Sequence, residues 1–280
     1  MSLNLARIGG WNEGDCIMKP LKITAAVQQF CRYRPLLREL VLRDLKIKYR
    51  RSFLGYLWSL LNPLLMMIIM SLVFSHMFRF SIPNYPLYLI CGQTLWAFFN
   101  GSTNTAMTSV IYNSPLIRKV YIPKFIFPIS RVLSSFVTMS FSLAAILIVM
   151  LATRVQLTWY VLLFPIPLGL LLLFCMGMGM VLSALAVYFR DMLHLYSVVV
   201  MAWMYLTPIF YPISALPEGV ALLIRFNPMY HYLTFFREVV LYGALPAPHL
   251  WLGCFGFSVL SLAVGLAVFR KLQRNFILYL

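Results

Sequence analysis

Few side chains in this sequence could carry proton-transfer or metal chemistry. General acid–base catalysis needs ionisable groups held together in a cavity, and metal sites need clustered ligands. The acidic residues are Glu13, Asp15, Glu39, Asp44, Asp191, Glu218 and Glu238, and the histidines are His76, His194, His231 and His249. No two acids pair inside an apolar stretch, and the histidines are scattered. We therefore predict no catalytic residue and no metal site in this chain.

Nucleotide and thiol chemistry are equally poorly supported. The sequence contains no GxxxxGK[ST] loop to cradle phosphates, so if the protein uses ATP, another chain must bind it. The cysteines lack the pairwise spacing of metal or redox sites and are interpreted as small core residues; they are Cys16, Cys31, Cys91, Cys175 and Cys254. We expect no cofactor in this chain.

The composition indicates that lipid is the solvent. Apolar residues make up 62% of the chain and charged residues 11%, and the mean hydropathy is +0.85. Soluble domains carry roughly 25% charged residues. The net charge of +16 comes without any nucleic-acid-binding signature, so we expect no nucleic-acid partner and attribute the charge to membrane orientation.

Apolar stretches long enough to cross a hydrocarbon core of about 30 Å predict an all-α membrane protein with about six transmembrane helices. The stretches lie at 54–78, 86–110, 126–151, 159–187, 193–212 and 250–269. The second is polar enough to need protein neighbours, because it contains Gln93, Thr94, Asn100, Ser102, Thr103 and Asn104.

Lysine and arginine predict the orientation. When the connecting segments alternate between two sides, one side holds 18 basic residues and the other 4, with Arg131 inside a span. Because cytoplasmic loops carry the excess of basic residues, we expect both termini to be cytoplasmic. An intramembrane cation faces a cavity or a counter-charge, but Arg131 lies near a helix end and could also snorkel to the interface.

Short segments between the spans suggest surfaces for function. Residues 36–51 form an amphipathic pattern, with Leu37, Leu40, Val41 and Leu45 on one face and Arg43, Lys46 and Arg50 on another. It is either a simple headgroup anchor or a surface that also grips a partner or a substrate lipid. Asn62-Pro63 predicts a bend that frees a carbonyl one turn earlier.

Three connections could be more than loops. Residues 113–128 suit a short helix parallel to the membrane, which would be either a docking helix or a plain positive loop. The sequence YFRD at 188–191 could form a second contact, or Asp191 could cap the fifth span. Residues 213–249 contain two short helical patterns, 217–225 and 229–242, separated by Asn227-Pro228 and closed by Gly243 and Pro246; we expect re-entrant helices there.

Five segments in one order resemble the ABC-2 type permease family, and within it the exporters of O-antigen and related polysaccharides, with teichoic acid exporters as close relatives. The resemblance covers about residues 30–280 and leaves out residues 1–29. The segments are RDLKIKYRRSFLGYLWSLLNPLL (43–65), SPLIRKVYIPKFIFP (114–128), YFRDMLHLY (188–196), YLTPIFYPIS (205–214) and NPMYHYLTFFREVVLYG (227–243).

The resemblance implies a type V exporter-like transmembrane domain and a division of the chain into segments. These are a cytoplasmic segment at 1–35, an amphipathic interface helix at 36–52, a six-helix transmembrane domain at 53–270 with a coupling helix at 114–122 and outer gate helices at 217–242, and a cytoplasmic tail at 271–280. The resemblance also implies a multi-pass protein of the bacterial inner membrane that exports an undecaprenyl-diphosphate-linked polysaccharide. Its partners would be a second copy of the permease and two copies of an ATPase subunit that binds ATP and Mg.

The same resemblance assigns candidate residues. Aromatic faces can stack on sugar rings, so the aromatic candidates for the substrate path are Tyr56, Trp58, Trp96, Phe98, Phe99, Tyr205, Phe210, Tyr211, Phe226 and Tyr230. The intramembrane cation Arg131 is a further candidate for the path. The candidates for the lipid diphosphate are Arg43, Lys46, Lys48, Arg50 and Arg51. The candidates for coupling to the ATPase are Pro115, Leu116, Ile117, Arg118, Lys119, Arg190 and Asp191.

Other functions remain as alternatives. A capsule or teichoic acid exporter of the same family would share every feature above. A membrane-embedded glycan-processing enzyme would need a poised acid or base, and an ion-driven carrier would need ionisable groups near the midplane and paired repeats. The sequence shows neither feature apart from Arg131.

Overall fold

The structure is a computed structural model that describes residues 33–50, 54–78, 82–120, 122–156 and 158–279, with the side chains of Tyr49 and of residues 75–78 left aside. It comprises two compact units, Met1–Glu39 and Leu40–Leu280. Of the first unit, the described residues form the beginning of helix α2 (Arg34–Tyr49). Residues 1–32 of the predicted cytoplasmic segment 1–35, and Arg51, lie outside the described residues. All contacts discussed below lie within Leu40–Leu280.

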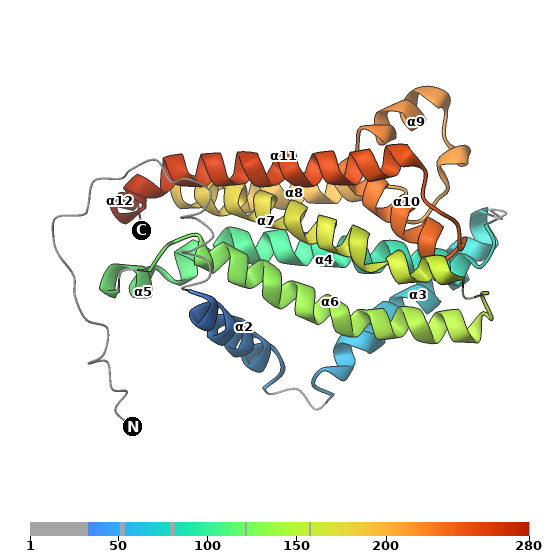
Figure 1. The fold of residues 1–280 in the computed structure, drawn as a ribbon, viewed down its shortest axis with the longest axis horizontal. Helices are drawn as coiled ribbons and strands as arrows, with labels where there is room; N and C mark the ends of the chain where they lie inside the picture. Colours follow the sequence, from blue (N-terminus) through green and yellow to red (C-terminus); the bar gives the residue numbers. More distant parts are fainter. Residues whose placement is uncertain (1–32, 51–53, 79–81, 121, 157, 280) are drawn as a thin grey trace. The chain divides into compact units, whose positions relative to one another are not determined.

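Every regular element within the described residues is a helix, as predicted (Figure 1). The long helices are α3 (Leu57–Phe78), α4 (Tyr85–Tyr112), α6 (Ile126–Ala152), α7 (Pro165–Tyr188) and α11 (Pro248–Leu272). The shorter helices are α5 (Ser114–Lys119), α8 (Met192–Tyr205), α9 (Glu218–Arg225), α10 (Pro228–Val240) and α12 (Phe276–Tyr279). Single 3₁₀ turns are η1 (Trp159–Leu163), η2 (Ile213–Ala215) and η3 (Gln273–Asn275).

Each predicted span overlaps a helix, but the helices differ in their ability to cross a membrane. Among the described residues, 4 stretches are long and apolar enough: Leu57–Phe74, Ile126–Ala152, Trp159–Tyr188 and Pro248–Tyr279. Helix α4 has the length, with 28 residues, but carries the polar side chains noted above. The all-helical fold predicted for a membrane protein is therefore confirmed for the described residues, and four of their helical stretches meet the length and composition of a span.

Helix α8 is shorter than the predicted span 193–212. It has 14 residues and ends at Tyr205. Pro208 cannot donate a helical N–H and disfavours the helical conformation at Thr207. The apolar run nevertheless continues through Ile209 and Phe210 in non-helical backbone. Such a break inside an apolar environment requires other groups to bind the freed carbonyls.

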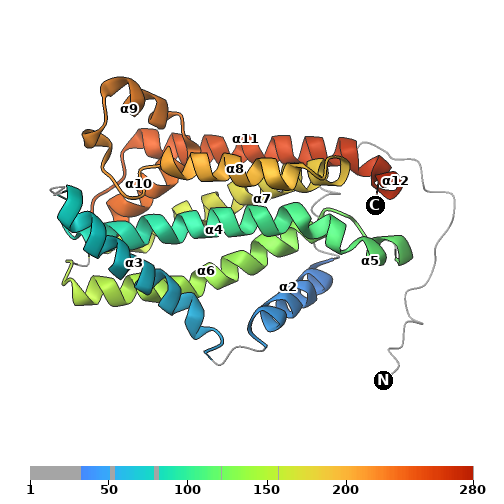
Figure 2. The ribbon, with the colours of Figure 1, turned by 180° about the vertical axis from the view of Figure 1, so that it is seen from behind.

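Helix α4 is the centre of the packing. It contacts α3, α6, α7, α8 and α10, and Figures 1 and 2 show it running along the bundle between α6 and α7. Helix α3 crosses the outside of α4 and α6, and 6% of its apolar stretch Leu57–Phe74 is buried. Most of α3 is therefore free to face lipid or a further protein chain.

Helices α7 and α11 approach each other closely through small residues. A Cβ atom on Gly177 would collide with the backbone of Ser261, and one on Gly265 would collide with the carbonyl oxygen of Gly177. Ser261 Oγ donates to the carbonyl of Phe174 at 2.9 Å. This small-residue contact with an interhelical hydrogen bond is typical of membrane helix pairs.

Helix α5 and the segments beyond α11 lie at one end of the Leu40–Leu280 unit, and α9 lies at the other (Figures 1 and 2). Helix α5 ends at Lys119, earlier than the predicted 114–122 segment, because Val120 is extended, with φ −134° and ψ 135°. Pro123 follows shortly after, and a proline favours extended backbone before it. The predicted tail is tied down: Tyr188 Oη donates to the carbonyl of Leu272 at 2.8 Å, and Phe276 is fully buried.

Candidate functional site

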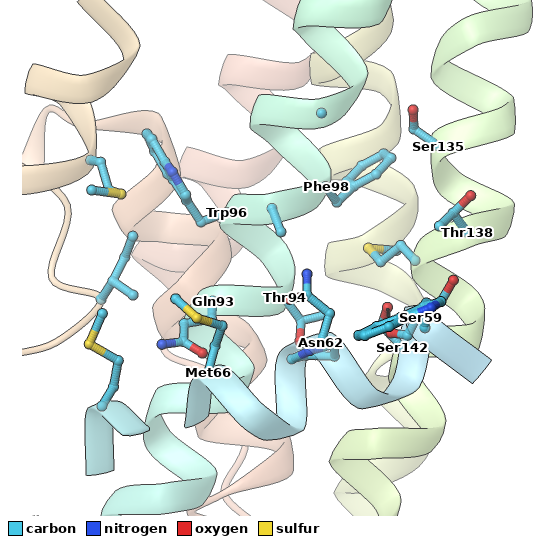
Figure 3. A pocket seen from close by; sticks show the side chains of 18 of the residues that line it. Ser59, Asn62, Met66, Gln93, Thr94, Trp96, Phe98, Ser135, Thr138 and Ser142 are labelled. Carbon is cyan, nitrogen blue, oxygen red and sulfur yellow. Dashed lines mark hydrogen bonds between the residues drawn. The ribbon is translucent and has the colours of Figure 1, made fainter. Parts of the chain in front are cut away.

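A groove of about 630 Å³ lies between α3, α4 and α6, and its walls combine hydroxyl, amide, aromatic and thioether groups (Figure 3). The polar side chains come from all three helices and are Ser59, Asn62, Gln93, Thr94, Ser135, Thr138 and Ser142. Sites for small organic ligands share this mixture of apolar walls and a few convergent polar groups. The groove is therefore the candidate binding site.

Proline in α3 shapes one wall of the groove. Pro63 lies inside α3, so the carbonyl of Ser59 one turn earlier has no helical N–H to accept. Ser142 Oγ of α6 donates to that carbonyl at 2.8 Å. The predicted freed carbonyl is confirmed, and it ties α3 to α6 at the groove.

Two polar atoms of α4 in the groove lack a partner. Gln93 Oε1 and Thr94 Oγ1 are buried and make no hydrogen bond, and the whole of Thr94 is only 3% exposed. Buried polar atoms of proteins are nearly always bonded. These two atoms therefore have unused hydrogen-bonding capacity in the wall of the groove.

The structure brings part of the predicted aromatic set together at the groove. Trp58, Trp96, Phe98 and Phe210 all line it. Trp96 is 6% exposed and Phe98 is 4% exposed. The ring of Trp96 packs against that of Phe99, with 5.3 Å between ring centres, and the ring of Phe98 packs against that of Phe136, with 5.7 Å between ring centres. Such supported rings offer preorganised apolar faces.

The other predicted path residues lie elsewhere. Phe99 is completely buried and packs against Phe174 and Trp203 in the core. Tyr56 is exposed, and its ring centre lies 5.3 Å from that of Phe141. The remaining aromatic candidates flank the break after α8 or the two short helices beyond it, and they are Tyr205, Tyr211, Phe226 and Tyr230.

Arg131 has a counter-charge. Its Nη1 lies 3.2 Å from Oδ2 of Asp44, which is 8% exposed on α2. Ser134 Oγ donates to the same Asp44 oxygen at 3.4 Å. Of the interpretations considered for Arg131, the paired cation is confirmed, and the pair joins the end of α2 to the beginning of α6.

The basic candidates of α2 separate in space. Lys48 lines the groove. Arg43 is exposed and contacts Asp44 at 3.3 Å, while Lys46 and Arg50 are exposed. Leu40 and Leu45 are buried, so the amphipathic character predicted for this helix is confirmed.

Arg237 is the main feature that sequence reasoning missed, because the charge count included it only among the four basic residues of the less basic side. It is 4% exposed in α10, and its guanidinium donates to three backbone carbonyl oxygens. The bonds run to Tyr88 O at 3.1 and 3.3 Å, Pro208 O at 2.7 Å and Ile209 O at 3.0 Å. The signal that could have revealed it is a lone cation among Leu233, Phe236 and Val240 on one helical face.

Arg237 and two tyrosines of α4 bind the backbone carbonyls of the non-helical segment after α8. Tyr88 Oη donates to the carbonyl of Tyr211 at 2.8 Å, and Tyr85 Oη donates to that of Phe210 at 2.8 Å. Gly92 makes room for the guanidinium, because a Cβ atom there would lie 2.5 Å from Arg237 Nη2. The non-helical segment that carries Phe210 into the groove is therefore fixed from two sides.

Asn227 connects the end of α8 to α10. Its Oδ1 accepts from Trp203 Nε1 at 2.8 Å and caps α10 by accepting from the N–H of Met229 at 3.0 Å. Its Nδ2 donates to Thr207 Oγ1 at 2.9 Å. The predicted break at Asn227-Pro228 is thus both a helix cap and an interhelical clamp.

The predicted coupling residues are mostly accessible. Pro115, Arg118 and Lys119 of α5 are exposed, as are Arg190 and Asp191. Ile117, by contrast, is buried at 8% exposure, and Leu116 is half-buried. Asp191 occupies the N-cap position of α8 without a side-chain cap bond, so the capping alternative does not account for its side chain.

Lys124 anchors the tail close to α5. Its Nζ donates to the carbonyl of Gln273 at 2.8 Å and lies 5.5 Å from the centre of the Phe276 ring. Burial lowers the pKa of Lys124 from its ordinary value. The contact holds the chain after α11 against the beginning of α6.

The described residues contain no group of three or more His, Cys, Asp or Glu side chains that could hold a metal ion. The groove offers hydroxyl, amide and aromatic groups, which can bind and orient a polar organic molecule. Such a set of groups suits binding and passage better than proton transfer.

Comparison with known proteins identifies the family. Residues 35–241 match the model of the ABC-2 type transporter family. The O-antigen export system permease protein RfbA of Myxococcus xanthus is 32% identical over 252 residues, covering 89% of this chain and 97% of that protein. RfbA of Klebsiella pneumoniae is 32% identical over 238 residues, covering 84% and 90%. The polysialic acid transport protein KpsM of Escherichia coli is 21% identical over 247 residues, covering 84% and 92%. This chain therefore belongs to the ABC-2 type transporter family.

Proposed function

We propose that this chain is the membrane-spanning permease subunit of an ATP-driven exporter that moves an undecaprenyl-diphosphate-linked polysaccharide, with O-antigen as the expected cargo. The observation that carries the proposal is the groove of hydroxyl, amide and aromatic side chains between apolar helices. A polysaccharide presents hydroxyl groups and the apolar faces of sugar rings, and both have counterparts there. The two RfbA proteins at 32% identity favour O-antigen among the possible cargoes.

The energy source is a separate ATPase subunit that binds ATP and Mg. Helix α5 and the Arg190–Asp191 turn present exposed charged residues at the ends of α4 and α7. A docked ATPase that closes on nucleotide would push α5, and the rigid helix α4 behind it would carry the displacement to the groove. Pro115, Leu116, Ile117, Arg118 and Lys119 form the proposed coupling helix.

The working assembly contains two copies of this chain and two ATPase subunits. Apolar side chains of α3 and α8 lie exposed on the unit, among them Leu65, Ile68, Ile69, Leu72, Val198 and Met201. The core around α4 is filled, so a path wide enough for a polymer must run along a surface that another copy completes. We place the protein in the bacterial inner membrane with both termini in the cytoplasm, in accord with the basic residues near α5 and the tail.

Residues at the groove and at the break after α8 have distinct proposed roles. Trp58, Trp96, Phe98 and Phe210 stack on sugar rings in the groove, and Lys48 attracts the lipid diphosphate. Further candidates for attracting the diphosphate are Arg43 and Lys46 of α2, Arg50 directly after it, and Arg51, which lies outside the described residues. Helices α9 and α10 form the outer gate, with Tyr230 and Phe226 near its edge.

Copurification and export test this function. The affinity-tagged permease, expressed with its ATPase subunit, should bring that ATPase down from detergent extracts. Deleting the permease gene should remove the polysaccharide from the cell surface while lipid-linked glycan accumulates inside. Normal surface polysaccharide in the deletion strain would contradict the proposal.

A capsule exporter is the second candidate. It rests on the similarity to the polysialic acid transport protein KpsM at 21% identity. The same deletion strain distinguishes O-antigen export from capsule export, because loss of capsule with intact O-antigen would identify the chain as part of a capsule exporter.

A further inference from the structure

The groove carries partnerless polar atoms whose chemistry restricts the ligand. Gln93 Oε1 accepts hydrogen bonds and donates none, and it is buried without a partner, as is Thr94 Oγ1. A buried acceptor that loses its donor costs free energy. Whatever occupies the groove must therefore supply a hydrogen-bond donor to Gln93 Oε1, whereas the hydroxyl of Thr94 can itself donate or accept.

Sugar hydroxyls meet this requirement and anionic groups do not. A hydroxyl both donates and accepts, as water does, so a sugar can replace water against Gln93 and Thr94 without loss. An ionised carboxylate or phosphate only accepts. It would leave Gln93 Oε1 without a donor and would also face the acceptor lone pairs of the amide oxygen.

The charge of the groove leads to the same restriction. Among the described residues that line it, Lys48 alone carries a charge. The other polar groups are neutral, and Met66, Met70 and Met139 fill much of the remaining wall. Moving a carboxylate out of water into such a site is strongly unfavourable without a paired cation. A single lysine could pair with one anionic end group but not with a charge on every repeat.

We infer that the groove is a hydroxyl-reading site at Gln93 and Thr94 that accepts uncharged sugar units, so that the exported glycan has a neutral repeat and carries its negative charge at the lipid diphosphate end. Trp96 and Phe98 follow these two residues on the same helix and supply ring faces, and all four residues line the groove (Figure 3). This inference rests on the proposed function and adds the chemical class of its substrate.

The test uses the complex of permease and ATPase in vesicles with two probes. One probe is an undecaprenyl-diphosphate-linked mannose oligomer, and the other is an oligomer of equal length with a glucuronic acid in every repeat. Stimulation of ATP hydrolysis and protection from externally added glycosidase report on binding and export. The wild-type complex should respond to the neutral probe at about tenfold lower concentration than to the acidic one, because a site built for hydrogen-bond donors discriminates against a group that cannot donate.

Variants assign the effect to the two side chains. Thr94→Val and Gln93→Leu should each raise the concentration of neutral probe needed for half-maximal stimulation by about three- to tenfold, which corresponds to one lost hydrogen bond, and should leave the response to the acidic probe unchanged. Thr94→Ser keeps the hydroxyl and should restore the wild-type response. Thr105→Val is the matched control, since Thr105 is exposed on the same helix outside the groove.

Several outcomes would overturn the inference. Equal responses of the wild-type complex to both probes would exclude a neutral-sugar site but leave the exporter function standing. Unchanged responses of both α4 variants to the neutral probe would exclude their role as hydroxyl readers. A complex that hydrolyses ATP yet neither responds to nor moves either lipid-linked glycan would contradict the exporter function itself.

Discussion

The guanidinium carbon of Arg237 lies 3.4 Å from the centre of the Tyr88 ring, and the same guanidinium bonds the backbone carbonyl of Tyr88. The cation thus stacks on the side chain of the residue whose backbone it binds. Cation–π contacts strengthen when both groups are removed from water. The pair joins α10 to the beginning of α4, and through Pro208 and Ile209 it also holds the end of α8.

Replacing Arg237 should destabilise the protein strongly. Arg237→Met would remove the guanidinium donors from the carbonyls of Tyr88, Pro208 and Ile209, and only Pro208 keeps a further side-chain donor, Tyr88 Oη at 3.2 Å. Each buried group left unsatisfied costs about 1–3 kcal/mol. Arg237→Lys should lose less, although an ammonium cannot match the planar fork. Thermal unfolding in detergent, followed by the fluorescence of a thiol-reactive dye at the buried cysteines, measures the change. Arg225→Met, at the exposed end of α9, is the control, and an equal loss in both variants would refute the proposed clamp.

The pair of Asp44 and Arg131 should behave as one unit. Asp44→Asn and Arg131→Met should each lower stability, because each leaves a partly buried charge unpaired. The double variant should lose less than the sum, with a coupling free energy of roughly 0.5–3 kcal/mol in a double-mutant cycle. Arg43→Ala, which removes the exposed contact to Asp44, should change stability by less than about 0.5 kcal/mol. Strictly additive losses would mean that the two charges do not stabilise each other.

The contact between α7 and α11 should not tolerate a methyl group. Gly177→Ala places a Cβ atom against the backbone of Ser261, and overpacking of this kind costs about 1–3 kcal/mol. Gly169→Ala, on the same helix in open space, should be neutral or slightly stabilising because alanine has the higher helix propensity. Unfolding of both variants in the same detergent gives the comparison. A stable Gly177→Ala protein would show that the helices are farther apart than described.

The sequence is sufficient to predict the long helices and several of the breaks between them. Runs of apolar residues bounded by proline and charge locate α3, α4, α6, α7 and α11, and Asn227-Pro228 separates α9 from α10. Pro63 alone predicts the freed carbonyl that Ser142 binds. These features depend on neighbours in the chain, which local patterns describe well.

The remaining features depend on residues far apart in the sequence. The apolar run after Tyr205 reads as more helix, because composition does not distinguish a helix from an extended segment whose carbonyls are bound by Arg237 and Tyr88. The hydrogen bonds of Arg237 could not be predicted for the same reason. The groove assembles Ser59, Thr94 and Ser142 from three helices, and no local spacing encodes that meeting.

The coupling role of α5 is tested best at its exposed charges. Arg118→Glu together with Lys119→Glu reverses two exposed residues, whereas a charge at Ile117 would also disturb its buried packing. Charge reversal at an interface costs several kcal/mol, so recovery of the ATPase with the tagged permease should fall by about tenfold or more. Membrane insertion should be unchanged.

The control for this prediction is Arg225→Glu, on α9 at the other end of the unit, which should retain the ATPase. Full recovery of the ATPase with the α5 double variant would place the docking surface elsewhere, with the Arg190–Asp191 turn as the next segment to change.

Reconstitution tests the central claim most directly. Vesicles that contain this chain alone should neither hydrolyse added ATP nor move a lipid-linked glycan across the bilayer, whereas vesicles that contain the chain with its ATPase subunit should do both. Transport or nucleotide turnover by the chain alone, or an inert complex with a catalytically active ATPase, would contradict the account.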